Sequence, residues 1–365
     1  MPELPEVETV ARGLRQAVLG RRILSVALGK TDFIDDPAAL EQHLPGRTIE
    51  AIERYGKFML LRLSPVVGGN ANHREGDPQQ ASLLVHLGMT GRMAPSPAAK
   101  PREKHTHVCL LLDDGRELRY TDARRFGRIA YLTEVPLEQE LTRFGADPLE
   151  IDKAEFVKRI RERHARIKAL LLDQRVLRGV GNIYADESLW RAKIHPSQLG
   201  AKLTRQQAET LWRALQEILR KAIVLRGSSI SDFLDAEGEP GEYQRRHRAY
   251  GREGKSCHRC KAAIRRGLVA GRSSYFCPNC QRPPGDLRLC RCRRKPSACL
   301  RGSRGAPTNL DARRSPASQP GEGHRGGPYQ RRDRPGADDF ARSRPQRYFG
   351  GCGANGGTMC EPAHF

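Results

Sequence analysis

Apolar and polar residues change their spacing along this chain of 365 residues, and each change predicts a different architecture. Residues 3–19 carry an apolar residue at every third or fourth position, which is the period of an amphipathic helix. From residue 23 to about residue 133 the apolar runs become short or alternate with polar residues, which indicates strands. The helical stripe consists of Val7, Val10, Ala11, Leu14 and Val18.

The strand-rich region predicts an antiparallel sandwich or barrel. Its clearest runs are residues 58–61, 82–87, 107–112 and 117–120, and turn residues such as Asp113-Asp114-Gly115 separate them. Residues 66–80 are polar and rich in glycine, so we expect an exposed loop there.

A helical period returns over residues 153–226 and is followed by a short cysteine-containing segment. The chain is therefore predicted to be an α+β protein. We expect a helix and β-sandwich domain over 1–135, a helical domain over 136–245 and a four-cysteine finger with a β-hairpin over 246–281. The remaining residues, 282–365, form a separate tail.

The tail has a composition that cannot build a hydrophobic core. From Gln281 onward it contains no Val, Ile or Trp and only four Leu. It has 16 Arg and one Lys against seven acidic residues, so it holds about +10 of the formal net charge of +22. We expect it to be disordered. It is either an Arg-rich arm that adds non-specific DNA affinity, or a non-native extension from a shifted reading frame, which we favour.

The net charge of +22 and the pI of about 10.0 favour a polyanionic partner, with nucleic acid ahead of an anionic membrane surface. No apolar run is long enough to span a membrane, and the N-terminus lacks the apolar region of a signal peptide. We therefore expect a cytoplasmic protein in a reducing compartment, where clustered cysteines bind metals more often than they form disulfides.

The first residues after the initiator methionine combine three reactive groups. Removal of Met1 leaves Pro2 with a secondary amine, which is a nucleophile able to form a Schiff base. Glu3 and Glu6 follow one helical turn apart and can act as acids or bases. The alternative is an ordinary helix start, because proline and glutamate are common in a first helical turn.

Four cysteines predict a structural zinc site. Cys257 and Cys260 form one Cys-x-x-Cys pair, and Cys277 and Cys280 form another, with 16 residues between the pairs. Two such turns on a hairpin can close a tetrahedral site with four sulfur ligands. A site with no open position holds a fold and does not catalyse, so we expect one structural Zn²⁺.

Other short motifs suggest contacts with a nucleic acid. A Gly-x-Gly turn at residues 179–181 brings backbone N–H groups close to a partner at a helix start, although it also serves as a plain connection. Met89 and Phe126 lie at turns beside glycine, and with Arg124 they can fill the gap left by an extruded base or simply pack in a core. Lys57 is a candidate catalytic amine or phosphate clamp, or a solvated surface lysine.

Taken together, the motifs resemble those of bacterial formamidopyrimidine-DNA glycosylases. The resemblance covers residues 1 to about 281 and no part of the tail. Leu4 favours the oxidised-purine branch, because the related endonuclease VIII branch usually has glycine there. The matching motifs are Pro-Glu-Leu-Pro-Glu-Val-Glu-Thr at 2–9, Tyr-Gly-Lys at 55–57, His-Leu-Gly-Met-Thr-Gly at 86–91, Tyr-Thr-Asp-Ala-Arg-Arg-Phe-Gly at 120–127, Gly-Val-Gly-Asn-Ile-Tyr-Ala at 179–185 and Gly-Arg-Ser-Ser-Tyr-Phe-Cys-Pro-Asn-Cys-Gln at 271–281.

The resemblance implies a role for each candidate residue. Pro2 would attack the anomeric carbon, Glu3 would serve as general acid–base at the sugar, and Glu6 would orient the site. Met89, Arg124 and Phe126 would fill the gap in the duplex, with Arg124 facing the unpaired cytosine. A loop near residues 226–233 would cover the everted base. The residues that would bind phosphates are Lys57, Lys168, Asn182 and Arg272, with His86 supporting the same backbone contact.

The resemblance further implies a bifunctional glycosylase and abasic-site lyase of base excision repair. Its partner would be double-stranded DNA that contains an oxidised purine or an abasic site, and it would act as a monomer without an external cofactor. The alternatives are a catalytically silent damaged-DNA-binding protein, an endonuclease VIII-like enzyme for oxidised pyrimidines, and a zinc-ribbon module of a nucleic-acid complex. Ala123 replaces a proline that is common before Arg-Arg-Phe, and the segment 226–230 departs from the usual pattern, so lesion preference is less defined than reaction type.

Overall fold

The computed structural model describes residues 1–65, 80–229, 236 and 238–283. The predicted tail beyond residue 283, most of the predicted loop at 66–80 and part of the predicted covering loop at 226–233 lie outside these residues. The described chain contains helices and antiparallel strands, so the predicted α+β class is confirmed.

Helix α1 (Leu4–Val18) opens the fold and has the apolar face that the sequence predicted. It begins with a capping box, in which the Glu3 backbone N–H donates to the Glu6 carboxylate at 2.9 Å and the Glu3 side chain caps the first turn. This reciprocal capping fixes the two carboxylates next to each other at the helix start.

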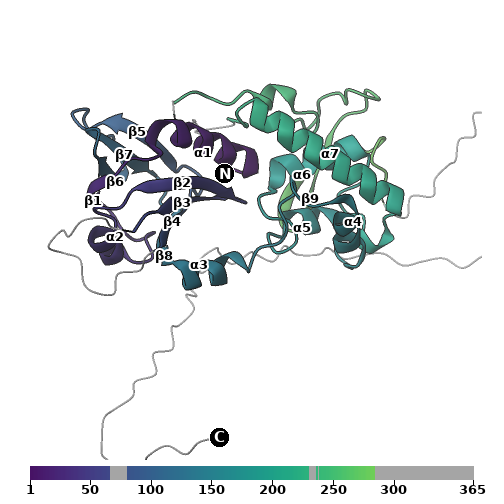
Figure 1. The fold of residues 1–365 in the computed structure, drawn as a ribbon. Helices are drawn as coiled ribbons and strands as arrows, with labels where there is room; N and C mark the ends of the chain where they lie inside the picture. The colour runs from purple at the N-terminus through teal and green to yellow at the C-terminus, as the bar shows by residue number, and fades with distance from the viewer. Residues whose placement is uncertain (66–79, 230–235, 237, 284–365) are drawn as a thin grey trace, which may run out of the picture. The chain divides into compact units, whose positions relative to one another are not determined.

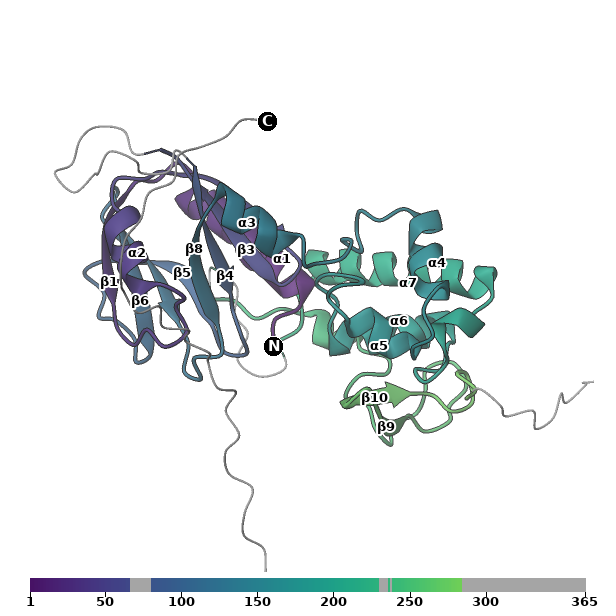
Figure 2. The same ribbon diagram turned by 90° about the horizontal axis from the view of Figure 1, so that it is seen from below.

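Two four-stranded antiparallel sheets follow and pack around α1 (Figures 1 and 2). One sheet has the order β1-β6-β7-β5 and the other β2-β3-β4-β8. Their bounds are β1 (Ile23–Leu28), β2 (Ile49–Tyr55), β3 (Phe58–Leu63), β4 (Ala81–His86), β5 (Arg92–Pro97), β6 (Thr106–Leu112), β7 (Arg116–Thr121) and β8 (Arg128–Thr133).

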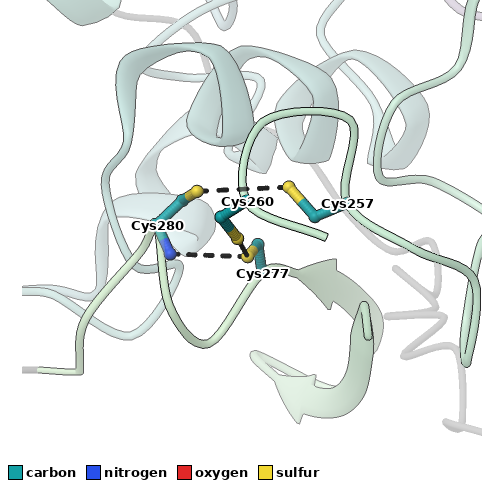
Figure 3. A group of neighbouring side chains, drawn as sticks. All are labelled: Cys257, Cys260, Cys277 and Cys280. Atoms are coloured by element: carbon teal, nitrogen blue, oxygen red, sulfur yellow. Dashed lines mark hydrogen bonds between the residues drawn. The ribbon is translucent and has the colours of Figure 1, made fainter. Parts of the chain in front are cut away.

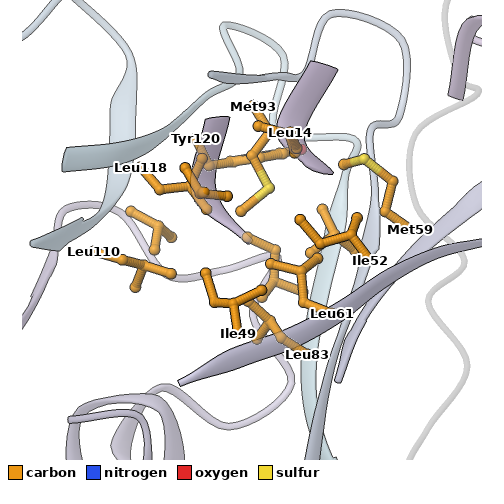
Figure 4. Close-up of a cluster of buried hydrophobic side chains, with 14 of the residues drawn as sticks. Leu14, Ile49, Ile52, Met59, Leu61, Leu83, Met93, Leu110, Leu118 and Tyr120 are labelled. Carbon is orange, nitrogen blue, oxygen red and sulfur yellow. The ribbon is translucent and has the colours of Figure 1, made fainter. Parts of the chain in front are cut away.

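The inner faces of both sheets and the apolar stripe of α1 share one core (Figure 4). Leu14 of α1, Leu61 of β3 and Leu118 of β7 are each fully buried in it. A smaller cluster on the outer face of the second sheet packs under α3 (Glu134–Leu141). The sequence did not predict α3 or the short α2 (Pro37–His43), although Asp36 caps α2 by accepting a hydrogen bond from the Ala39 N–H.

The helical part consists of α4 (Lys153–Arg161), α5 (Ile167–Leu172), α6 (Asn182–Ala192) and α7 (Arg205–Val224), with the short 3₁₀ turns η1 (Gly200–Lys202) and η2 (Tyr243–Arg246). The hairpin β9 (Arg265–Val269) and β10 (Arg272–Phe276) ends the described fold. Leu4 of α1 is fully buried in the apolar cluster of these helices, although the rest of α1 packs in the sandwich. The first turn of α1 is therefore anchored in both parts of the fold.

Candidate active site and metal centre

The Pro2–Glu6 stretch lies against the turn that precedes α6. The Leu4 N–H donates to the Gly179 carbonyl at 3.0 Å, which fixes the backbone directly behind Pro2. Gly179 has φ +96°, and a Cβ there would lie 2.9 Å from the Leu4 side chain. A Cβ on Gly181 would lie 2.2 Å from the Glu3 carboxyl carbon. The two glycines of the Gly-x-Gly turn are thus required for the N-terminal segment to approach.

Glu3 binds the start of α6. Its carboxylate accepts hydrogen bonds from the Ile183 N–H at 2.9 Å and the Tyr184 N–H at 3.4 Å, where the partial positive charge of the helix stabilises an anion. Burial outweighs these contacts and raises the pKa of Glu3 to about 7, while the nearby Lys57 ammonium opposes the rise. A carboxyl group that titrates near neutral pH can both donate and accept a proton, as general acid–base catalysis requires.

The Glu6 carboxylate accepts three hydrogen bonds. It accepts hydrogen bonds from the Tyr184 hydroxyl, from the Ser228 N–H at 2.7 Å and from the Glu3 N–H. Burial raises its pKa, and these donors oppose the rise. Ser228 belongs to the segment in which the covering loop was predicted, so Glu6 connects that segment to the Pro2–Glu6 stretch. Sequence reasoning gave no role to Tyr184 or Ser228, although Tyr184 lies inside a quoted motif.

Lys57 lies at the turn between β2 and β3, and its side chain is only 9% exposed. Burial lowers its pKa, and the Glu3 carboxylate opposes this while the Arg272 guanidinium adds to it. The solvated-surface alternative for Lys57 is therefore wrong. The adjacent Gly56 lies beside the Gly179 turn that binds Leu4, since a Cβ on Gly179 would be 3.2 Å from the Gly56 Cα.

Ion pairs hold the Lys57 turn against the Gly179 turn. The Arg178 guanidinium stacks on the Tyr55 ring at 4.2 Å and lies 3.7 Å from the Asp147 carboxylate. Arg54 of β2 bridges Asp147 at 2.8 Å and Glu8 of α1 at 3.1 Å. Because Arg54 and Asp147 are nearly buried, these pairs are well shielded from solvent and fix the geometry of the strand that leads to Lys57.

His86 ends β4 and is neutral near pH 7. Burial lowers its pKa to about 4, and the charges of Lys57 and Arg128 add to this effect. Its Nδ1 accepts a hydrogen bond from the Gly88 N–H at 3.1 Å, and its ring packs against Phe58. The imidazole thus supports the turn that carries Met89.

The structure brings Met89, Arg124 and Phe126 together on two adjacent turns. Phe126 is 56% exposed and Met89 40% exposed, so the core-packing alternative is wrong for both. The Arg124 guanidinium lies 4.6 Å from the centre of the Phe126 ring. The buried Asp122 joins the turns by accepting hydrogen bonds from the Thr90 hydroxyl and from the Gly127 N–H. Apolar side chains held out into solvent in this way are suited to wedge between bases.

The predicted phosphate-binding residues of the helical part meet at strand β10. Asn182 donates to the Ser273 carbonyl at 3.0 Å, and the neighbouring Arg272 is exposed. Lys168 is not exposed as a residue that binds a phosphate would be. It is fully buried, pairs with Asp186 at 2.7 Å and donates to the Ser273 carbonyl at 2.8 Å. In this position its ammonium supports the strand that carries Arg272 and does not face solvent.

The four cysteines form one cluster, as the spacing predicted (Figure 3). Their sulfur atoms all lie within 4.8 Å of one another, with 4.0 Å between Cys257 and Cys280 and 3.4 Å between Cys260 and Cys277. Four thiolates at about 2.3 Å from a tetrahedral ion are separated by similar distances, so the cluster fits a structural metal. Gln281 locks the last turn, since it accepts from the Cys277 N–H and donates to the Ile194 carbonyl.

Family models match three segments of the chain. Residues 1–129 match the formamidopyrimidine-DNA glycosylase N-terminal domain, and residues 144–234 match the H2TH domain of the same enzyme. Residues 254–283 match a zinc finger found in FPG and IleRS. The cysteine cluster lies within this last segment.

Full-length relatives and solved structures agree with these matches. The formamidopyrimidine-DNA glycosylase of Solibacter usitatus is 44% identical over 284 residues, which cover 77% of this chain and 100% of the relative. That of Desulforamulus reducens is 41% identical, with 77% and 99% covered.

Among solved structures, MutM (Fpg) from Thermus thermophilus is 40% identical with a TM-score of 0.65, covering 77% of this chain and 98% of that chain. The Lactococcus lactis Fpg in complex with DNA containing an abasic site is 34% identical with a TM-score of 0.69, covering 77% and 100%. The N-terminal stretch, the exposed turns and the cysteine finger therefore belong to one known enzyme architecture, and this chain is a member of the formamidopyrimidine-DNA glycosylase family.

Proposed function

We propose that the chain excises oxidised purines from double-stranded DNA and then cleaves the resulting abasic site, with Pro2 as the nucleophile. The observation that carries this proposal is the convergence of the Pro2 stretch, Glu3 and Lys57 beside the helix start at Asn182. These groups come from distant parts of the sequence, and a deoxyribose delivered there would meet an amine and two proton-transfer groups. The amine forms when Met1 is removed.

The reaction follows from these groups. Pro2 nitrogen attacks the anomeric carbon, and the bond from that carbon to the base breaks as the base takes up a proton. Glu3 protonates the ring oxygen as the sugar opens, so an iminium ion forms between the secondary amine of Pro2 and the former anomeric carbon. The positive charge of the iminium ion acidifies the adjacent sugar hydrogen. Its removal expels the 3′ phosphate, and a second elimination expels the 5′ phosphate.

The remaining roles concern DNA and the metal. Lys57, Asn182 and Arg272 would bind phosphates beside the extruded nucleotide, and Met89, Arg124 and Phe126 would occupy the vacated space. Extrusion costs a few kcal/mol of unstacking and unpairing, which phosphate contacts and the wedge offset. The four cysteines would hold one Zn²⁺, which stabilises the hairpin that carries Arg272 and takes no part in the chemistry. We propose that the enzyme acts as a monomer in the bacterial cytoplasm. The described residues include no helix with the length and apolar character of a membrane span.

The range of lesions that the protein excises can be measured by direct comparison of substrates. Another solved complex of the Lactococcus lactis Fpg contains an oxidised pyrimidine. Duplexes with 8-oxoguanine, a formamidopyrimidine and an oxidised pyrimidine should therefore be compared directly. We expect the two oxidised purines to be cleaved faster, and a clear preference for the pyrimidine would favour the endonuclease VIII-like alternative.

Borohydride trapping on an 8-oxoguanine duplex tests the proposed nucleophile. The wild-type protein, with loss of Met1 verified by mass spectrometry, should form a covalent complex with DNA. Undiminished trapping by a Pro2→Gly variant would remove Pro2 as the main nucleophile. Absence of trapping and of strand cleavage in the processed wild type would leave the catalytically silent DNA-binding alternative.

A further inference from the structure

A concave site lies on the helical part of the fold. It is a cavity of about 350 Å³ between α6, α7, η2 and the first cysteine turn. Trp190 and Tyr243 are among its lining residues and are almost fully buried, and the Arg259 guanidinium lies 3.8 Å from the centre of the Trp190 ring. Helix α6 begins at Asn182, beside the proposed phosphate-binding strand, and reaches the cavity with its last turn, about 15 Å away at 1.5 Å per residue. The lining residues are Glu187, Trp190, Arg191, Glu217, Ile218, Lys221, Tyr243, Arg246, Arg248, His258 and Arg259.

The lining carries an excess of positive charge. It contains four arginines and one lysine against two glutamates, a formal excess of three positive charges with histidine neutral. The glutamates are already engaged. Glu187 accepts hydrogen bonds from three successive backbone N–H groups at residues 248–250, and Glu217 pairs with Arg191. Both carboxylates keep their charge, and the excess of three positive charges already takes them into account.

Two of the cations have no counter-charge within the described part of the chain. Lys221 and Arg246 form no ion pair with any residue that the structure describes. Arg248 points its guanidinium at the His258 ring, 3.0 Å from Nδ1, instead of at an acid.

We propose that this cavity binds the carboxylates of an acidic peptide segment from a partner protein. Guanidinium groups bind carboxylates through paired, planar hydrogen bonds, and these bonds are stronger inside a cavity than at a flat, fully hydrated surface. A short flexible segment can enter a cavity of this size. A DNA duplex is a rigid cylinder whose phosphates lie on its convex outside, so it suits the protruding Arg272 strand better than this hollow.

Fluorescence anisotropy with the full chain and a labelled peptide of about ten residues, rich in Asp and Glu, tests the proposal. The double variant Lys221→Glu/Arg246→Glu should weaken binding about tenfold or more, because it removes two attractions and adds two repulsions. The matched control is Arg213→Glu/Arg245→Glu. It makes the same charge change on α7 and η2 with side chains that do not line the cavity, and we expect a loss of less than about threefold.

The comparison of the two double variants distinguishes binding in the cavity from non-specific attraction of an acidic peptide to a basic protein. Equal weakening by the two double variants would overturn the proposal. So would full displacement of the peptide by an abasic-site duplex at stoichiometric amounts, since the peptide would then occupy the DNA site. Both variants should retain borohydride trapping, which shows that they are folded. If the Glu variant does not fold, Lys221→Gln/Arg246→Gln replaces it, and unchanged peptide binding by that variant would overturn the proposal.

Discussion

Replacing Glu3 by glutamine should abolish excision and, at the same time, make the protein more stable above neutral pH. The carboxyl of Glu3 is buried, and its pKa is raised to about 7 from an ordinary value of 4.5, mainly by loss of hydration. Ionisation of this group therefore costs free energy in the folded protein that it does not cost in the unfolded chain. Glutamine has nearly the same shape and can still accept the Ile183 hydrogen bond, but it never ionises.

The pKa difference sets the magnitude. The difference of 2.5 between about 7 and 4.5 corresponds to about 3 kcal/mol at about 1.4 kcal/mol for each pH unit. Because the folded-state pKa of Glu3 is raised, its contribution to stability is fully present below about pH 4.5 and is lost as the pH rises through about 7. The advantage of Glu3→Gln should therefore grow from under about 1 kcal/mol near pH 5 to about 3 kcal/mol near pH 8.5.

Urea and thermal unfolding of wild type and variant at these two pH values measure the effect. Near pH 8.5 the thermal midpoint of the variant should be higher by roughly 5–10 °C. Glu53→Gln is the control, because the Glu53 carboxylate is 52% exposed and, among the residues that the structure describes, pairs with the similarly exposed Arg62. The stability difference between Glu53→Gln and wild type at the two pH values gives the baseline against which that of Glu3→Gln is compared.

An equal free-energy difference for Glu3→Gln at both pH values would refute the reasoning, since the cost would then not come from ionisation. Retained excision by the variant would refute the assignment of Glu3 as the acid–base group. The combination of higher stability and lost activity is typical of a catalytic carboxyl that is held in an unfavourable environment.

Other consequences can be measured independently. Lys168→Met should cost roughly 3–5 kcal/mol in urea unfolding because it leaves the buried Asp186 uncompensated, and adding Asp186→Asn should recover most of this; a small loss in the single variant would contradict the buried pair. Metal analysis should find about one zinc per chain, and Cys257→Ser should weaken DNA binding, whereas a metal-free, stable and active protein would exclude a structural metal. Phe126→Ala should slow excision from duplex DNA by about tenfold or more while sparing cleavage of a single-stranded abasic site, because only the duplex requires a wedge. Truncation after Gln281 should leave specific cleavage nearly unchanged, and a large loss at physiological salt would show that the tail contributes to binding.

Local patterns in the sequence determined much of the fold. The 3.6-residue period of residues 3–19 matches α1, and the apolar runs at 58–61, 82–87, 107–112 and 117–120 match β3, β4, β6 and β7. Short elements such as α2 and α3 were not predicted, because a helix of two turns has too few positions to show a period. The cysteine cluster was predictable because two Cys-x-x-Cys turns supply all four ligands of a tetrahedral ion. The prediction therefore did not depend on how the rest of the chain folds.

What the tertiary structure decided is the environment of each reactive group. The sequence indicates that Glu3 can act as an acid or base and that Lys57 is a candidate catalytic amine or phosphate clamp. Only the approach of the α6 start and of the Lys57 turn buries the two groups and shifts their pKa values. The tertiary structure also gives Lys168 and Arg272 different exposure to solvent: Lys168 is buried behind β10, whereas Arg272 is exposed on that strand. Side-chain chemistry is a property of the sequence, whereas hydration and charge neighbours come from contacts between residues far apart in the chain, which no local pattern encodes.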